Sequence, residues 1–356
     1  MRLGIIGLPQ SGKTTLFNAL TRMTQPTGIA SGRMEIHTAV VDVPDPRVDR
    51  LSAMFKPRKT IYAKVTYADI AGLEGNTAKT GISGTLLNQL TQMDGFIHVV
   101  RCFENDAVPH PFESIDAQRD ILSMDTELIL NDLIAVERKL ERLVEEKHKG
   151  AGREKAIIER ETALFERFQA VLSAEIPLRD ETITAEEEKT LSGFGFLTRK
   201  PVLVVLNLSE GQSPPAVVYQ HRQSQVVALQ CELEMEIAQL PPEEAQDFLK
   251  EYGIEEPSLN RMIRLSYDLL GLQSFFTVGP DEVRAWTVRR GALAPEAAGE
   301  IHTDLQKGFI RAEVVAYNDL VALGGMPEAR NKGKLRLEGK DYTVLDGDIL
   351  NIKFNI

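Results

Sequence analysis

The sequence has few of the features that build extracellular scaffolds or membrane proteins. Two cysteines in 356 residues, Cys102 and Cys231, exclude a disulfide framework or a cysteine-rich zinc site and are typical of a reducing cytosol. No apolar run approaches the ~18 residues of a transmembrane helix. The first residues, with Gly4 and Gly7, differ from a signal peptide. We therefore expect a cytoplasmic protein with no membrane segment.

The chain also lacks the surface chemistry of a protein that coats nucleic acid. Aromatic residues make up 6% and include one tryptophan, so stacking platforms for single strands are sparse. Lys and Arg number 41 against 52 Asp and Glu, a net charge of −11, which allows only a local basic patch. With 356 residues, the chain exceeds the ~250–300 at which one core stops growing. We expect several domains.

Strand-like and helix-like segments alternate in the first third of the chain, and strand-like runs return after residue 200. The strand-like runs cover residues 2–8, 38–43, 61–70, 96–103, 201–208 and 225–229. Residues 14–23 carry apolar side chains at helical spacing. Nearly continuous apolar runs are typical of parallel strands buried on both faces. The alternation predicts an α/β fold with a doubly wound, mostly parallel sheet, over residues 1–124 and 193–272.

A helical insert over residues 125–192 interrupts this pattern. Its apolar residues step alternately by four and three, which is a heptad seam. The seam comprises Ile129, Leu133, Val136, Leu140 and Leu143, then Ile157, Leu164, Phe168 and Val171, with Glu161 as a polar break. A turn at residues 148–153 predicts an antiparallel coiled-coil hairpin. The alternative is two amphipathic helices packed on the sheet. Basic residues at the tip suit an acidic partner such as RNA, or simply solvent.

Residues 273–356 form a third unit with shorter elements. Turns at Gly279, Gly339 and Gly347 separate its segments. Strands are expected at 275–278, 283–288, 311–317, 335–338, 342–345 and 349–354, and a helix at 295–308. This order predicts a small mixed sheet with one main helix.

Residues 7–14 read GLPQSGKT and match the phosphate-binding pattern G-x-x-x-x-G-K-[ST], between a strand and a helix as the pattern requires. Glycines let backbone N–H groups surround phosphate oxygens. Lys13 would contact the β and γ phosphates, and the Thr14 hydroxyl would bind magnesium. The alternative is a glycine turn without a ligand. The expected nucleotide contacts here are Pro9, Gln10, Ser11, Gly12, Lys13, Thr14 and Thr15.

Residues 69–72 supply the second half of such a site, with the pattern D-x-x-G at a strand end. Asp69 would hold the magnesium shell, and the Gly72 N–H would meet the γ-phosphate. Leu73 follows, where Ras-like enzymes place a glutamine that orients water. Water is therefore positioned by another group, or hydrolysis is slow.

Base recognition is expected at residues 207–210, which read N-L-S-E. GTPases have N-K-x-D there, and the aspartate accepts hydrogen bonds from guanine. Here Leu208 replaces the lysine and Glu210 the aspartate, which moves the acceptor by about one C–C bond. This argues against guanine without proving adenine. The alternative is an ordinary polar strand end beginning at Asn207.

Together these motifs resemble the YchF/Obg-like ATPase family. The resemblance extends to residues 98–103 (HVVRCF), 282–287 (EVRAWT), 297–304 (AAGEIHTD) and 336–342 (RLEGKDY), and so covers nearly the whole chain. It implies a P-loop GTPase-type fold that prefers ATP, a coiled-coil arm, and a C-terminal TGS domain of the ubiquitin-like β-grasp type. It also implies association with the ribosome or translation factors.

The resemblance assigns further residues. His110, after the R-C-F strand, would assist hydrolysis alongside Lys13 and Gly72; the alternative is an exposed loop histidine. Thr14 and Asp69 would hold Mg²⁺, with ATP or ADP as the ligand. The loop that contacts the base through backbone atoms would be Gln230, Cys231 and Glu232.

The sequence departs from the family at two places. Gln10 stands where relatives have an asparagine that helps hold a monovalent cation, so the resemblance does not carry potassium dependence over. Arg33 stands at the threonine of the first switch segment. Thr27 or Ser31 substitutes for that threonine, or Arg33 contacts phosphate itself. These departures indicate a divergent branch whose rate and switch behaviour do not follow from the family.

The leading hypothesis is therefore a monomeric, magnesium-dependent ATPase that acts as a nucleotide-controlled switch on the ribosome. One alternative is an Obg-type GTPase, and another is a nucleotide-bound adaptor with negligible hydrolysis. RNA binding by the C-terminal unit could accompany any of these. The residues expected for it are Arg284, Trp286, Arg289, Arg290, Lys307 and Arg311.

Overall fold

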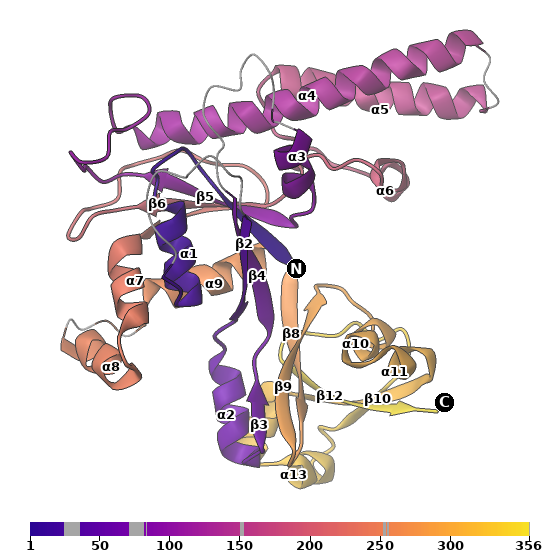
Figure 1. Ribbon diagram of the computed structural model, residues 1–356. Coiled ribbons are helices and arrows are strands. Elements are labelled where there is room, and N and C mark those ends of the chain that lie inside the picture. The colour runs from indigo at the N-terminus through magenta and orange to yellow at the C-terminus, as the bar shows by residue number, and fades with distance from the viewer. Residues whose placement is uncertain are drawn as a thin grey trace. The chain divides into compact units, whose positions relative to one another are not determined.

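The chain forms two compact units (Figure 1). The computed structural model describes residues 1–24, 36–70, 82, 84–149, 153–251, 254 and 256–355. Unit 1 comprises Met1–Ala39 and Thr66–Leu259, and unit 2 comprises Val40–Val65 and Asn260–Ile356. The three domains expected from the sequence remain a prediction. The contacts group residues 125–192 with unit 1 and residues 40–65 with the C-terminal part of the chain.

Unit 1 is built on a doubly wound sheet in the order β2-β4-β1-β5-β6-β7. Its strands are β1 (Arg2–Ile6), β2 (Ile36–Asp42), β4 (Lys64–Ile70), β5 (Gly95–Arg101), β6 (Val202–Asn207) and β7 (Ser224–Leu229). Pairing is parallel from β4 through β7. Every residue of β5 and β6 is buried, as their continuous apolar runs predicted. The expected α/β fold is confirmed.

Helices cover both faces of this sheet. In Figure 1, α1 (Lys13–Thr21) and α7 (Cys231–Gln239) lie on one face, and α3 (Gly84–Thr91) and α4 (Ala117–Lys149) lie on the other. Side chains of α3 and α4 complete the core against β5 and β6. The carboxyl ends of the parallel strands are therefore left as the edge at which loops gather, the usual ligand edge of such folds.

The predicted helical hairpin is present. Helix α4 packs along α5 (Lys155–Ser173), and α4 begins at Ala117, before the expected start at residue 125. The turn at 150–152 lies outside the described residues. One seam position is wrong: Ile157 is 41% exposed, and Ile158 is buried instead. The reason is register, since Ile158, Phe165 and Leu172 are all buried and recur every seven residues.

The polar break in the seam is satisfied by charge. Glu161 pairs with Lys139 at 2.8 Å and with Arg153. Arg153 also pairs with Glu146 at 3.0 Å. A carboxylate is therefore tolerated between the helices because two cations surround it.

Unit 2 is a mixed sheet in the order β11-β10-β12-β8-β9-β3. Its strands are β3 (Lys59–Ile61), β8 (Leu272–Val278), β9 (Glu282–Arg289), β10 (Phe309–Ala316), β11 (Arg336–Glu338) and β12 (Asp348–Phe354). The helices are α2 (Pro46–Phe55), α9 (Ser258–Leu269), α10 (Ala294–Ile301), α11 (Thr303–Lys307), α12 (Tyr317–Leu323) and α13 (Met326–Asn331). The remaining helices of unit 1 are α6 (Ala185–Leu191) and α8 (Pro242–Glu251).

Two expectations for this unit are wrong in detail. The predicted strand 342–345 is reduced to a single bridge between Leu293 and Thr343. The predicted helix 295–308 is two helices, because His302 is extended and its ring nitrogen accepts a hydrogen bond from Asp304 N at 3.2 Å, capping α11. Among the described residues, no helix meets the length and apolarity that crossing a membrane requires.

Residues 40–65 join unit 2 through specific pairings. Strand β3 runs parallel to β9. The guanidinium of Arg47 donates to Asp346 at 2.7 Å, to Asp45 at 2.8 Å, and lies over the ring of Phe276. A three-residue strand carries no periodicity of its own, so the sequence could not reveal this partner.

Candidate functional site

The loop between β1 and α1 has the backbone shape that the phosphate-binding pattern requires. Gly7 and Gly12 have φ angles of 147° and 97°, and Gln10 has 62°. A Cβ atom on Gly12 would lie 2.2 Å from Asn207 Nδ2, and one on Gly7 would lie 2.4 Å from Val99 O. Both glycines are therefore required by close backbone approach as well as by conformation.

Lys13 sits buried at the start of α1, within this loop. Its Nζ donates to Gly7 O at 3.1 Å and Leu8 O at 2.8 Å. Burial lowers the pKa of Lys13 to about 8, although the nearby Asp69 opposes the shift. The ammonium is thus held by the loop backbone in a poorly hydrated position, where an added anion would stabilise its charge.

Thr14 and Asp69 meet as the magnesium hypothesis requires. The Thr14 hydroxyl donates to Asp69 Oδ2 at 2.9 Å. Asp69 is the last residue but one of β4 and is buried, which raises the pKa of its carboxyl. Within the described part of the chain, Asp69 Oδ1 and Ser11 Oγ are buried without hydrogen-bond partners. A carboxylate oxygen without a partner, beside a threonine hydroxyl, fits a hard divalent cation such as Mg²⁺.

Asn207 links three segments of the site. Its Nδ2 donates to Ser11 O at 3.0 Å, and its Oδ1 accepts from Cys231 N at 3.1 Å. The phosphate loop, the end of β6 and the start of α7 are thereby brought together. The motifs and the family resemblance predicted Asn207 and Cys231 at one site, and the two residues are in direct contact in the structure.

The other residues expected at the base differ in exposure. Glu210 and Glu232 are exposed, and Gln230 is half-buried at the start of α7. Leu208 is buried in the core with Cys102, so its side chain serves packing. Burial raises the pKa of the Cys102 thiol to about 12 and also raises that of Cys231. Both thiols are buried, and the raised pKa disfavours the reactive thiolate form.

His110 is buried, so the exposed-loop alternative is wrong. Phe112 N donates to His110 Nδ1 at 3.1 Å, so Nε2 carries the proton and donates to Asp120 Oδ2 at 2.8 Å. Arg119 donates to the other oxygen of Asp120 at 2.8 Å. A role for His110 in hydrolysis remains a prediction. Both ring nitrogens are occupied, by Phe112 N and by Asp120, so at least one of these hydrogen bonds must break before the ring can contact water.

Several expected residues lie outside the described part of the chain. They are Thr27, Ser31, Arg33, Gly72 and Leu73. The candidate RNA surface of unit 2 can be described. Arg284 covers the ring of Trp286 at 3.7 Å, and Arg290 pairs with Asp268 at 3.1 Å. Trp286 also packs nearly parallel to Phe275, so it is no open platform for a base.

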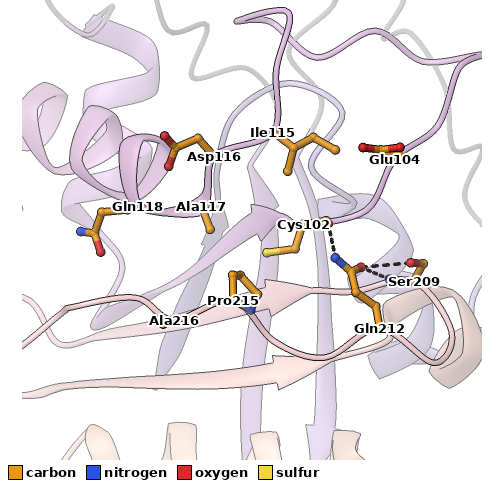
Figure 2. Close-up of a pocket in the computed structure, with 10 residues that line it drawn as sticks. All are labelled: Cys102, Glu104, Ile115, Asp116, Ala117, Gln118, Ser209, Gln212, Pro215 and Ala216. Carbon is orange, nitrogen blue, oxygen red and sulfur yellow. Dashed lines mark hydrogen bonds between the residues drawn. The ribbon is translucent and has the colours of Figure 1, made fainter.

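Gln212 makes polar contacts next to the base end of the site, and the sequence motifs did not predict them. Figure 2 shows its side chain between Cys102 and Ser209, at a cavity of about 620 Å³ beside the start of α4. Its Nε2 donates to Cys102 O at 2.6 Å, and its Oε1 accepts from Ser209 N at 2.9 Å. A glutamine in a loop rich in glycine, proline and serine carries no pattern that would have revealed it.

Comparisons with known proteins agree with this geometry. A family model described as 50S ribosome-binding GTPase matches residues 2–139. A second model, named YchF-GTPase_C and described as a protein of unknown function, matches residues 272–355.

Individual relatives match along the whole chain. Ribosome-binding ATPase YchF of Haemophilus influenzae is 42% identical, over 100% of this chain and 99% of the relative. The protein of the same name from Bacillus subtilis is 39% identical, over 99% of each. Obg-like ATPase 1 of Oryza sativa is 35% identical, over 100% and 92%. A solved structure, the Schizosaccharomyces pombe YchF GTPase, superposes with a TM-score of 0.82 at 29% identity, covering 99% of this chain and 97% of that one.

Proposed function

This chain belongs to the YchF family, and we propose that it is a magnesium-dependent ATPase that acts as a nucleotide-controlled switch on the ribosome. The observation that carries the enzymatic part is the pair formed by Thr14 and Asp69 beside buried Lys13. The ribosome enters the proposal through the relatives that match along the full length, which are named ribosome-binding ATPases. Such a protein would work in the cytoplasm, and we propose that it does so as a monomer.

Each residue of the site would have its own role in ATP hydrolysis. Lys13 and the loop backbone would neutralise the β and γ phosphates, with Pro9, Gln10, Ser11 and Thr15 completing the loop. Bound magnesium supplies charge stabilisation on the transferring phosphoryl group. Thr14 and Asp69 would hold that metal through their oxygens. The Gly72 amide would sense the γ-phosphate, and His110, once released from Asp120, would orient the water.

The preference for ATP over GTP rests on the base end of the site. Glu210 stands where guanine-specific enzymes have aspartate. Leu208 stands where they have lysine, and its hydrocarbon side chain is buried in the core. The peptide group of Cys231 lies beside Asn207, where a base can be contacted through the backbone of Gln230, Cys231 and Glu232.

Competitive equilibrium binding of ADP and GDP, with magnesium present, tests this preference. We expect ADP to bind at least about tenfold tighter, a difference of ~1.4 kcal/mol. A preference for GDP would show that Glu210 accepts from guanine, and would make the protein an Obg-type GTPase. Lys13→Ala is the control: it should abolish ATP hydrolysis, and full activity in that variant would contradict the mechanism.

RNA contact through the arm tip is less well supported by the side chains there. Arg153 is paired with Glu146 and Glu161, and Lys155 with Glu159 at 3.7 Å. Arg153 and Lys155 are therefore paired within the arm.

A further inference from the structure

Gln212 uses its whole amide group within the loop that follows β6. Its Nε2 donates to Cys102 O at 2.6 Å, while its Oε1 accepts from Ser209 N at 2.9 Å and lies 3.0 Å from Ser209 Oγ. Figure 2 shows the three residues and these bonds. One side chain thus ties the loop after β6 to the carboxyl end of β5.

The loop that Gln212 holds is a tight turn with Glu210 at its centre. Gln212 N donates to Ser209 O at 3.2 Å, and Gly211 has a φ of 70°. Glu210 and Gly211 therefore occupy the two central positions of a four-residue turn, the second of which favours glycine. The hydrogen bonds of the Gln212 side-chain amide hold the first residue of the turn, Ser209, and attach its last residue to Cys102.

Backbone pairing stops just before this turn. Cys102 N donates to Asn207 O, and Leu208 N donates to Leu229 O, each at 2.9 Å. Ser209 and Glu210 lie beyond these ladder bonds and are exposed. The placement of Glu210 relative to the phosphate loop consequently depends on the Gln212 bonds, because exposed loop backbone is otherwise free to move.

We propose that Gln212 is a positioning residue for base recognition, which fixes the turn so that Glu210 meets the nucleotide base at one place. The proposal rests on the proposed function, in which the base binds at the end of β6. Gln212 acts through the turn and does not touch phosphate. Its removal should therefore weaken the part of the affinity that comes from the base and leave the phosphate part intact.

The test measures dissociation constants of ADP, GDP and pyrophosphate for the full chain with magnesium. For Gln212→Ala, we expect ADP to bind about tenfold more weakly, the value of one lost oriented contact at ~1.4 kcal/mol. Pyrophosphate should bind within about twofold of the unchanged protein, and the ratio of ADP to GDP affinity should fall. Gln220→Ala changes an exposed glutamine of the same loop and should alter none of these values.

Gln212→Glu distinguishes the contribution of the amide oxygen from that of the amide nitrogen. It keeps an acceptor for Ser209 but puts an oxygen against Cys102 O, so it should behave like the alanine variant. Equal weakening of ADP and pyrophosphate would mean a general structural role and overturn the proposal, as would unchanged ADP binding in both variants. If the unchanged protein does not prefer ADP to GDP, the proposed ATP selectivity fails. The comparison of ADP with pyrophosphate still tests Gln212 in that case.

Discussion

Lys13 combines burial and charge at the position where the proposed function places phosphate. Its neighbours within the loop are carbonyl oxygens of Gly7 and Leu8, which stabilise an ammonium less than bulk water and a counter-ion do together. With a pKa of about 8, a fraction of Lys13 is already deprotonated near neutral pH. A bound polyphosphate would supply the missing counter-charge and raise the pKa again.

The first residue-scale prediction follows from this pKa. Below pH 8, Lys13 is charged before the nucleotide arrives, so affinity for ADP should be constant with respect to this group. Above pH 8, binding must also take up a proton, so affinity should fall, approaching about tenfold per pH unit. Titrations of ADP between pH 7 and 9.5, in buffers of different ionisation enthalpy, measure both the affinity and the proton uptake.

Lys13→Arg is the matched control for that experiment. A guanidinium stays protonated across the whole window, so this variant should bind ADP more weakly but without the decline above pH 8. A flat profile in the unchanged protein would contradict the assignment of Lys13 as the buried phosphate-binding cation.

At the scale of elements, the helical arm is held at its root by a buried carboxylate. Asp132 on α4 accepts hydrogen bonds from Leu197 N at 2.9 Å, Thr198 N at 2.7 Å and Thr198 Oγ1 at 2.7 Å. These partners lie just before β6, whose far end carries Asn207. The arm and the base end of the site are therefore connected through one strand.

The register of α5 against α4 gives an element-scale prediction. Ile158 is 5% exposed and Ile157 is 41% exposed, so two adjacent isoleucines occupy opposite environments. Ile158→Ala should destabilise the fold by about 2–5 kcal/mol because it leaves a cavity in the seam. Ile157→Ala should cost far less. Denaturant unfolding of both variants measures the difference, and equal losses would contradict this register.

At the scale of the whole molecule, the path of the chain connects the nucleotide site to unit 2. The chain passes from unit 1 to unit 2 after Ala39 and returns at Thr66, and Asp69 follows within the same strand. The intervening residues are held in unit 2 by β3 and by Arg47. Strands β2 and β4 therefore run from one unit into the other, and the proposed switch would use this covalent link to carry a change at the γ-phosphate to unit 2.

Co-sedimentation with ribosomes tests that switch. We expect the affinity of the protein for ribosomes to differ by about tenfold or more between a non-hydrolysable ATP analogue and ADP. The reason is that a nucleotide shifts a conformational equilibrium only by its differential affinity for the two states. Lys13→Ala should abolish the difference. Equal sedimentation in both states, with negligible ATP turnover, would instead identify the protein as an adaptor.

Local patterns were enough to predict much of the architecture. The apolar runs of β5 and β6, the phosphate loop at residues 7–14 and the heptad seam of α4 all depend on neighbours along the chain, and all are present in the structure. The misassigned details share one cause. The register of Ile158 and the break at His302 depend on packing or capping that spacing alone does not encode.

The sequence by itself determined the class of fold, and it predicted the residue types of the proposed phosphate and metal site, because both follow from short-range periodicity and motif chemistry. Only the tertiary structure decided the partners of His110, the membership of residues 40–65 in unit 2 and the bonds of Gln212. Residues 40–65 and Gln212 contact segments far away in the chain, whereas His110 contacts Asp120 and Phe112 within ten residues. The free energy of all these contacts comes from burial and hydrogen-bond geometry that exist only after folding.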